Sequence, residues 1–234
     1  MALTNVLSVR LRPEKARAYQ QCIGKVAERA RTKKDPFRWT AHQTIGGEVG
    51  MLHFVSEAPD WASIGTRDAT PEILILRLFG EADGARILDE VSSCTMGARQ
   101  TTGRERHDLS YPPEAKELAR ERAPFAVVTT LRARPGQQDV CEELIRKIAE
   151  AIPKVGDPAH ITTYQALIGD LRSYWTVRPL RALDDLDRQA QPSDLLSRAF
   201  GAGEGGLVYR TGLEAMESVE RSLVMLRSDL SNVS

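Results

Sequence analysis

Two of the four histidines, His42 and His53, flank the glycine-containing sequence Gly46-Gly47-Glu48. If Gly47-Glu48 is a two-residue hairpin loop, His42 lies directly opposite His53 on one face of a sheet. Two imidazoles placed in this way suit three roles: half-buried polar packing, acid–base or ligand contact with a pKa near working pH, and metal binding. We rank the roles in that order, because two ligands alone do not complete a metal site.

Arginines gather near the end of the first half of the chain, where Arg99, Arg104 and Arg106 lie on a predicted strand over residues 99–109. Guanidinium groups can hold a carboxylate or an enolate oxygen through paired hydrogen bonds. Charge on an exposed strand also protects a sheet edge from unwanted pairing, and this alternative is the stronger of the two.

The opposite face of the histidine hairpin contains Trp39, Gln43 and Phe54, and we expect it to meet helices. Trp39 and Trp61 could form the wall of a site for a flat aromatic ligand, although core packing is the more usual role of such residues. Gln43 has an identical counterpart in Gln165. A buried amide needs hydrogen-bond partners, so we expect each glutamine to join a strand to a helix or loop.

Residues 6–57 resemble residues 128–179, and after the loss of one position residues 71–110 resemble residues 192–231. This collinearity indicates a duplication. The second copy has Tyr164 and Trp175 in place of the two histidines, so the copies cannot present the same site. The identical pairs include Arg12-Pro13 with Arg134-Pro135, Asp35-Pro36 with Asp157-Pro158, Phe79-Gly80 with Phe200-Gly201, and Asp108-Leu109-Ser110 with Asp229-Leu230-Ser231.

Each half is predicted to fold as strand, helix, two strands, helices and strand, the last strands spanning residues 99–109 and 219–230. Such a sheet has helices on one face only, and two copies can cover each other's open faces. We therefore predict an α+β protein in which two tandem ferredoxin-like βαββαβ units form an intramolecular barrel with approximate two-fold symmetry. The predicted units are residues 1–110 and 124–234, and residues 111–123 form a charged linker.

The order of elements, the helix-opening prolines and the split last helix resemble the dimeric α/β-barrel superfamily. This superfamily includes antibiotic-biosynthesis-type monooxygenases, NIPSNAP-like proteins and haem-degrading monooxygenases. The resemblance implies a cleft between sheet and helices for a small, flat, hydrophobic or aromatic ligand. It also implies oxygenation without metal, flavin or other cofactor, in which a base deprotonates a phenol-like substrate that then reacts with O₂. His42 or His53 would be the base, Trp39 the wall, and Arg104 or Arg106 the partner of the oxyanion.

Three classes of function follow from these patterns. The first is a small-molecule enzyme or ligand-binding protein, and a cofactor-independent monooxygenase acting on a flat hydrophobic or aromatic substrate is one member of this class. The second is a non-catalytic assembly or interaction module built on the tandem barrel. The third is a haem-binding or haem-degrading protein, whose axial ligand would be one of four histidines: His42, His53, His107 or His160.

Composition narrows the partners of the chain. Lys+Arg and Asp+Glu both total 32, so no net charge attracts nucleic acid or a membrane. The longest aliphatic run, residues 73–76, is too short to cross a bilayer. Three cysteines, Cys22, Cys94 and Cys141, occupy unmatched positions, which argues against a disulfide framework and favours a cytoplasmic location. No phosphate-binding, CxxC or HExxH motif is present, and further assembly into homo-oligomers is left open.

Overall fold

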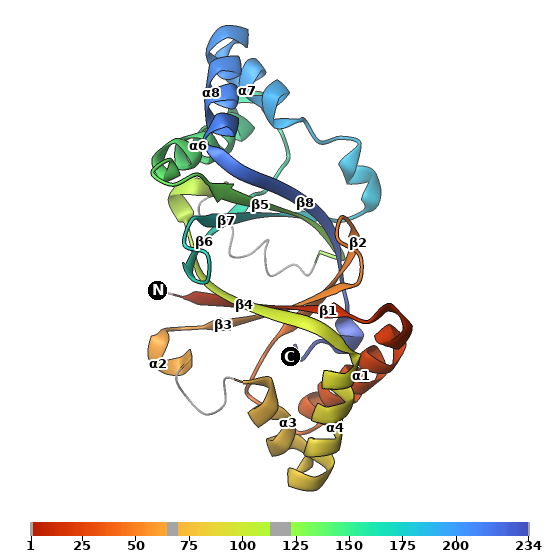
Figure 1. Cartoon of the computed structure of the whole chain (residues 1–234). Helices are drawn as coiled ribbons and strands as arrows, with labels where there is room; N and C mark the ends of the chain where they lie inside the picture. Colours follow the sequence, from red (N-terminus) through yellow and green to blue (C-terminus); the bar gives the residue numbers. More distant parts are fainter. Residues whose placement is uncertain (1, 65–69, 113–122, 234) are drawn as a thin grey trace. The chain divides into compact units, whose positions relative to one another are not determined.

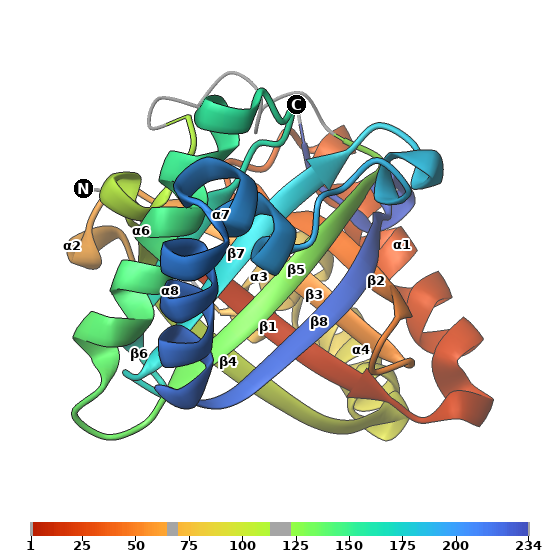
Figure 2. The same cartoon turned by 90° about the horizontal axis from the view of Figure 1, so that it is seen from above.

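The computed structural model describes residues 2–64, 70–112 and 123–233 (Figures 1 and 2). Most of the predicted linker, residues 113–122, lies outside the described residues. The elements of the first half are β1 (Leu3–Leu11), η1 (Pro13–Lys15), α1 (Ala16–Thr32), β2 (Thr40–Gly46), β3 (Met51–Ala58), α2 (Trp61–Ile64), α3 (Pro71–Phe79), α4 (Glu81–Cys94), β4 (Thr95–Glu105) and η2 (His107–Leu109).

The second half has the same order of strands and main helices. Its elements are β5 (Phe125–Ala133), α6 (Gln138–Val155), β6 (Thr162–Ile168), β7 (Ser173–Leu180), η3 (Leu183–Leu186), α7 (Pro192–Phe200), α8 (Ala202–Glu214), β8 (Met216–Leu226) and η4 (Ser228–Leu230).

The strands pair as a closed barrel in the order β1-β3-β2-β8-β5-β7-β6-β4, and the predicted α+β class with two βαββαβ units is confirmed. By their contacts the residues group into two compact units. Unit 1 contains residues 1–103 and 225–234, and unit 2 contains residues 104–224. The end of β4 therefore belongs to unit 2, and the end of β8 belongs to unit 1.

The central hairpins of the two units have the same strand register at equivalent residues. His42 on β2 is opposite His53 on β3, as the sequence predicts, and Tyr164 on β6 is opposite Trp175 on β7. Gly47 and Gly169 directly follow β2 and β6 and begin connections over residues 47–50 and 169–172, which are longer than the expected two-residue loop. Their φ angles of 101° and 105° are a backbone conformation that favours glycine. The turns therefore fix which side chains share a face of each sheet.

Helix α1 follows from its sequence. Pro13 opens the short turn η1 before it, where the missing N–H of proline costs nothing. The buried side chains of α1 recur every three or four residues and form one apolar face. These residues are Tyr19, Cys22, Ile23, Val26, Ala27 and Ala30.

The predicted ends of the last strands are wrong. Strand β4 ends at Glu105 and β8 ends at Leu226, and each is followed by a single 3₁₀ turn instead of more strand. The cause is a set of contacts made by the residues after the turn. Ser110 Oγ donates to the Arg106 carbonyl (2.7 Å) and accepts from the Thr163 amide (2.9 Å), which folds the chain back and buries Leu109.

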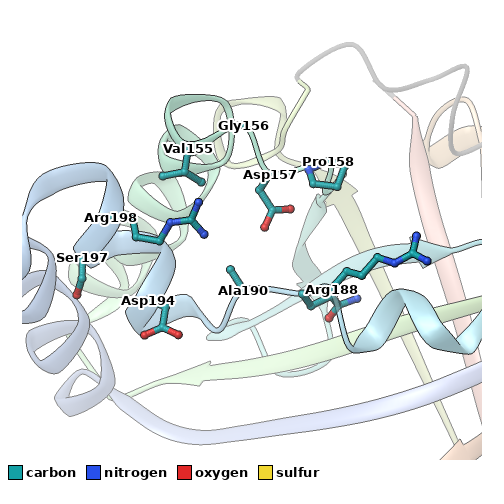
Figure 3. A pocket seen from close by; sticks show the side chains of 10 residues that line it. Val155, Gly156, Asp157, Pro158, Arg188, Ala190, Asp194, Ser197 and Arg198 are labelled. Atoms are coloured by element: carbon teal, nitrogen blue, oxygen red, sulfur yellow. The ribbon is translucent and has the colours of Figure 1, made fainter.

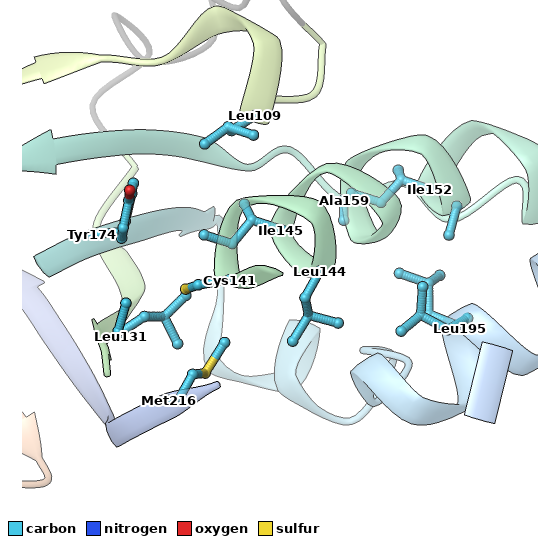
Figure 4. Close-up of a cluster of buried hydrophobic side chains, with 13 residues drawn as sticks. Leu109, Leu131, Cys141, Leu144, Ile145, Ile152, Ala159, Tyr174, Leu195 and Met216 are labelled. Atoms are coloured by element: carbon cyan, nitrogen blue, oxygen red, sulfur yellow. The ribbon is translucent and has the colours of Figure 1, made fainter. Parts of the chain in front are cut away.

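Unit 2 has one main apolar core under helices α6, α7 and α8 (Figure 4). Leu144 and Ile145 of α6 meet Tyr174 of β7, whose ring is fully buried. Leu109, from the turn after β4, completes this core. Unit 1 has two smaller cores between its strands and helices α1, α3 and α4, and Leu230 from the turn after β8 enters the first of them.

Candidate functional site

The two histidines belong to a polar row on the face of the unit 1 sheet that its helices leave uncovered. Ala41, Leu52 and Val9 point into the helix-covered cores. Side chains alternate along a strand, so the residues next to these three point to the other face. Ser8 on β1 pairs with His53 on β3, which pairs with His42 on β2. Three neighbouring strands thus place a hydroxyl and two imidazoles side by side.

Hydroxyl groups hold both imidazoles in place. His53 Nδ1 is 2.8 Å from Ser8 Oγ, and His53 Nε2 is 3.0 Å from Thr44 Oγ1. His42 Nε2 is 3.0 Å from Thr40 Oγ1. A neutral imidazole has one N–H and one acceptor nitrogen, so one hydroxyl at His53 accepts and the other donates. Among the described residues, nothing is hydrogen-bonded to His42 Nδ1.

Both imidazoles are kept neutral. Burial, and to a smaller extent repulsion from the neighbouring His53, together lower the pKa of His42 to about 4. Burial also lowers the pKa of His53. The expected general base with a pKa near working pH is therefore replaced by a neutral imidazole, which is suited first to accepting a hydrogen bond.

The predicted substrate-binding residues Trp39, Gln43 and Phe54 lie on the helix side of the hairpin, away from the histidine row. Trp39 is 6% exposed in the core formed with α1 and α3, and its Nε1 donates to the Leu230 carbonyl at 2.8 Å. Phe54 packs against the same cores. Gln43 Oε1 accepts from Arg227 Nη1, which joins a strand to a loop in the way predicted.

Trp61 is the last of the predicted substrate-binding residues. It begins the short helix α2, and it is 49% exposed. The structure therefore does not bring Trp61, Trp39 and Phe54 together around the histidines.

Arg106, predicted as an oxyanion partner, is committed to a network in unit 2. Its Nε and Nη2 donate to the Asp108 carboxylate, and its Nη1 and Nη2 donate to the Glu142 carboxylate, at 2.7 to 2.8 Å. Nη1 also donates to Gln165 Oε1 at 2.9 Å. These bonds raise the pKa of Arg106 and lower that of Glu142. Every guanidinium N–H is engaged, so none is left for an oxyanion.

Arg104 lies at the end of β4, one strand position before Glu105. Its Nη2 donates to Gln165 Oε1 at 3.1 Å, and its buried Nε has no hydrogen-bond partner among the described residues. Arg104 and Arg106 both belong to unit 2, whereas the histidine row belongs to unit 1.

At the positions of the histidines, unit 2 has an aromatic pair. The rings of Tyr164 and Trp175 are stacked, with centroids 5.4 Å apart and planes 11° from parallel. Both side chains are half-buried. The predicted difference between the two copies is therefore a difference between a neutral polar row and an apolar aromatic surface.

Unit 2 also contains a cavity of about 510 Å³ that the sequence motifs do not indicate (Figure 3). It lies between the end of α6 and the start of α7. The sequence signal that could have found it is a pair of identical residues in both copies, Asp157 and Arg198, whose surroundings differ between the copies. Its lining also includes Val155, Pro158, Ala190 and Asp194.

No family model and no curated protein matches the sequence. Solved structures match its fold over nearly the whole chain. An anthrone oxidase-like protein has a TM-score of 0.63 at 14% identity, covering 100% of this chain and 94% of its own. A candidate monooxygenase from Fusobacterium nucleatum has a TM-score of 0.56 at 10% identity, covering 96% and 92%. Chlorite dismutase from Candidatus Nitrospira defluvii, in complex with imidazole, has a TM-score of 0.53 at 8% identity, covering 97% and 92%.

The chain has the dimeric α/β-barrel fold. In the described part of this dimeric α/β-barrel, no three His, Cys, Asp or Glu residues are grouped so that they could hold a metal ion. None of its described helices combines the length and the apolar character needed to cross a membrane. The three cysteines are buried and free.

Proposed function

We propose that the protein binds a small, flat, aromatic molecule at the His42–His53 row and oxygenates it without a cofactor. The observation that supports this proposal most is the neutral His42, whose Nδ1 is unoccupied while Thr40 fixes the ring through Nε2. A nitrogen of this kind accepts the proton of a phenolic or enolic hydroxyl. Solved structures of the same fold include an anthrone oxidase-like protein and candidate monooxygenases, which is consistent with this class of substrate.

The low pKa of His42 sets how the proton would move. Toward a free phenol with a pKa near 10, an imidazole with a pKa of about 4 is a weak base. A phenolate formed beside His42 would raise the pKa of the imidazole, because opposite charges at short range stabilise each other. The substrate anion and the imidazolium would therefore form together, and the electron-rich anion would react with O₂.

Anthrone is a suitable probe because its enol form presents a phenolic hydroxyl on a flat ring system. Its conversion to anthraquinone consumes one O₂ and releases one water, and the two hydrogens lost from carbon end in that water. We expect the double variant His42→Gln/His53→Gln to lose at least about 100-fold of the rate of oxygen uptake, as when a positioned base is removed. Tyr164→Phe in unit 2 is the matched control and should keep the rate. Full activity in the double variant would place the site elsewhere.

The same purified protein can be used to test two other functions, haem binding and a non-catalytic assembly role. A haem protein needs a histidine with a free ring nitrogen. His53 uses both of its nitrogens and His107 pairs with Glu105 through Nδ1, whereas Nδ1 of His42 and the buried Nδ1 of His160 have no hydrogen-bond partner among the described residues. Haem is therefore the second candidate, and a Soret band in the purified protein would favour it over the organic ligand. A non-catalytic assembly module would neither bind nor consume anthrone. The buried free thiols are consistent with a reducing cytoplasm as the place of action.

A further inference from the structure

The cavity in unit 2 lies where unit 1 has a closed ion pair. In unit 1, Arg77 of α3 donates from Nε to Asp35 Oδ2 at 3.1 Å and from Nη2 to Asp35 Oδ1 at 2.9 Å. The Asp35 side chain is only 6% exposed, and this bidentate pair joins the segment after α1 to helix α3. The matched residues in unit 2 are Asp157 and Arg198.

In unit 2 the same two residues do not meet. Asp157 Oδ1 accepts instead from the Ala159 amide at 2.8 Å and from Arg178 Nη2 at 3.3 Å. The Asp157 side chain is 6% exposed, and among the described residues Oδ2 has no hydrogen-bond partner. Arg198 makes no hydrogen bond or ion pair within the described part of the chain. Figure 3 shows the carboxylate and the guanidinium pointing toward one another across the cavity.

The rest of the lining is mixed, with polar side chains from Arg188, Gln189, Asp194 and Ser197 beside a smaller apolar part. Val155, Pro158 and Ala190 supply apolar surface on the sides of the cavity. Its volume of about 510 Å³ lies in the range of small-molecule sites. Asp194 of helix α7 is part of the lining, at the position where α3 of unit 1 has Ile73.

We propose that this cavity binds a small zwitterion of the amino-acid class. Its carboxylate would accept two hydrogen bonds from Arg198, and its ammonium group would donate to Asp157 Oδ2. The ammonium group of the ligand would then pair with Asp157 as Arg77 pairs with Asp35 in unit 1, and its carboxylate would pair with Arg198 as Asp35 pairs with Arg77. The apolar part of the lining would take an aliphatic side chain. This site is separate from His42 and does not depend on the proposed oxygenase activity.

L-leucine is the probe, measured by titration calorimetry on the full chain at pH 7. We expect saturable binding with a Kd of about 1 mM or tighter. Two half-ligands test the recognition of both charges: 4-methylpentanoate lacks the ammonium group, and 3-methylbutylamine lacks the carboxylate. Each should bind at least about tenfold more weakly. Equal binding of a half-ligand, or no saturable heat with leucine up to about 10 mM, would overturn the proposal.

Variants assign the binding to the cavity. Arg198→Ala should abolish leucine binding without lowering the melting temperature, because Arg198 is exposed and unpaired in the described structure. Asp157→Asn should also abolish binding, and Arg198→Ala alone decides the matter if Asp157→Asn unfolds. Arg210→Ala, on the exposed face of α8, is the control and should bind as the wild type does. Leucine binding that survives Arg198→Ala would refute this site, and His42→Gln should leave leucine binding unchanged.

Discussion

The two units share a backbone register but place their ionisable groups on opposite faces of the sheet. In unit 1 the imidazoles of His42 and His53 lie on the face without helices, tied to hydroxyl groups. In unit 2 that face has the stacked rings of Tyr164 and Trp175. A register that is kept while the side chains change shows that the backbone framework and the chemistry of its surfaces are determined by different residues.

The helix side shows the reverse arrangement. In unit 2, Tyr174 Oη donates to the Glu142 carboxylate, which Arg106 also binds, beneath helix α6. The matched positions in unit 1 are Leu52, Gln20 and Arg227, of which only Arg227 is ionisable. Both units therefore have an arginine–aspartate pair here, and unit 2 adds the carboxylate of Glu142 where unit 1 has the amide of Gln20. The following predictions test which of these features stabilise the fold.

The largest expected effect concerns the part that both units share. Leu109 and Leu230 are 0% and 1% exposed, and each is held in its core by the turn after the last strand. Leu109→Ala and Leu230→Ala should each lower the free energy of unfolding by about 3 to 5 kcal/mol, because each leaves a cavity in a packed core. Urea unfolding of both variants measures this. A large loss at one position and almost none at the other would show that the turns are not equivalent.

A smaller and unequal effect is expected at the matched arginines. Arg106 is bound by Asp108, Glu142 and Gln165, and its side chain is 15% exposed beside a carboxylate that is 16% exposed. Arg106→Met should lower the free energy of unfolding by about 3 kcal/mol, because it leaves the buried Glu142 carboxylate without its cation.

Arg227→Met in unit 1 is the comparison for this variant. Arg227 pairs with Asp229, a carboxylate that is 59% exposed, and donates to the amides of Gln20 and Gln43. We expect a loss of about 1 kcal/mol, since a pair that is open to water is screened. Equal losses in the two variants, measured by the same denaturant titration, would show that the additional carboxylate of Glu142 does not make the arginine of unit 2 more important for stability than that of unit 1.

The hairpin register was predictable because it depends on local chemistry. The connections span residues 47–50 and 169–172 and are longer than the two-residue turn expected, but the strands pair in the register that such a turn would give. Alternation along the strands then decides which side chains face each other. His42 opposite His53 and Tyr164 opposite Trp175 follow directly. The pKa of His42 was not predictable in the same way, because it depends on how many atoms from distant strands surround the ring.

The parts that escaped prediction depend on contacts between residues far apart in the sequence. The end of β4 is fixed by Ser110 and the Thr163 amide, so propensity over residues 99–109 alone favoured a longer strand. The cavity escaped because Asp157 and Arg198 are the same residue types as Asp35 and Arg77. Their separation depends on Arg178, which binds Asp157 and stands where unit 1 has Ser56.

The last expected effect is the pH dependence that the histidine row gives to unit 1. In the fold, the pKa of His42 is lowered from 6.5 to about 4, so below pH 6.5 the unfolded chain takes up a proton that the folded chain does not. The contribution is therefore fully present above pH 6.5 and is lost as the pH falls toward 4. From pH 7 to pH 5, His42 should account for a loss of about 2 kcal/mol in the free energy of unfolding.

The glutamine variant isolates this contribution from the carboxylates that also protonate in acid. Glutamine has no titrating group, so the difference in unfolding free energy between pH 7 and pH 5 should shrink by about 2 kcal/mol in His42→Gln. Tyr164→Phe, at the matched position of unit 2, should leave that difference as in the wild type, because neither side chain titrates in this range. If His42→Gln retains the wild-type pH dependence, folding does not lower the pKa of His42, and the imidazole gains its proton in the folded protein as readily as in the unfolded chain. That result would contradict the claim that the histidine row of unit 1 is kept neutral by burial, but it would not affect the shared strand register of the two units.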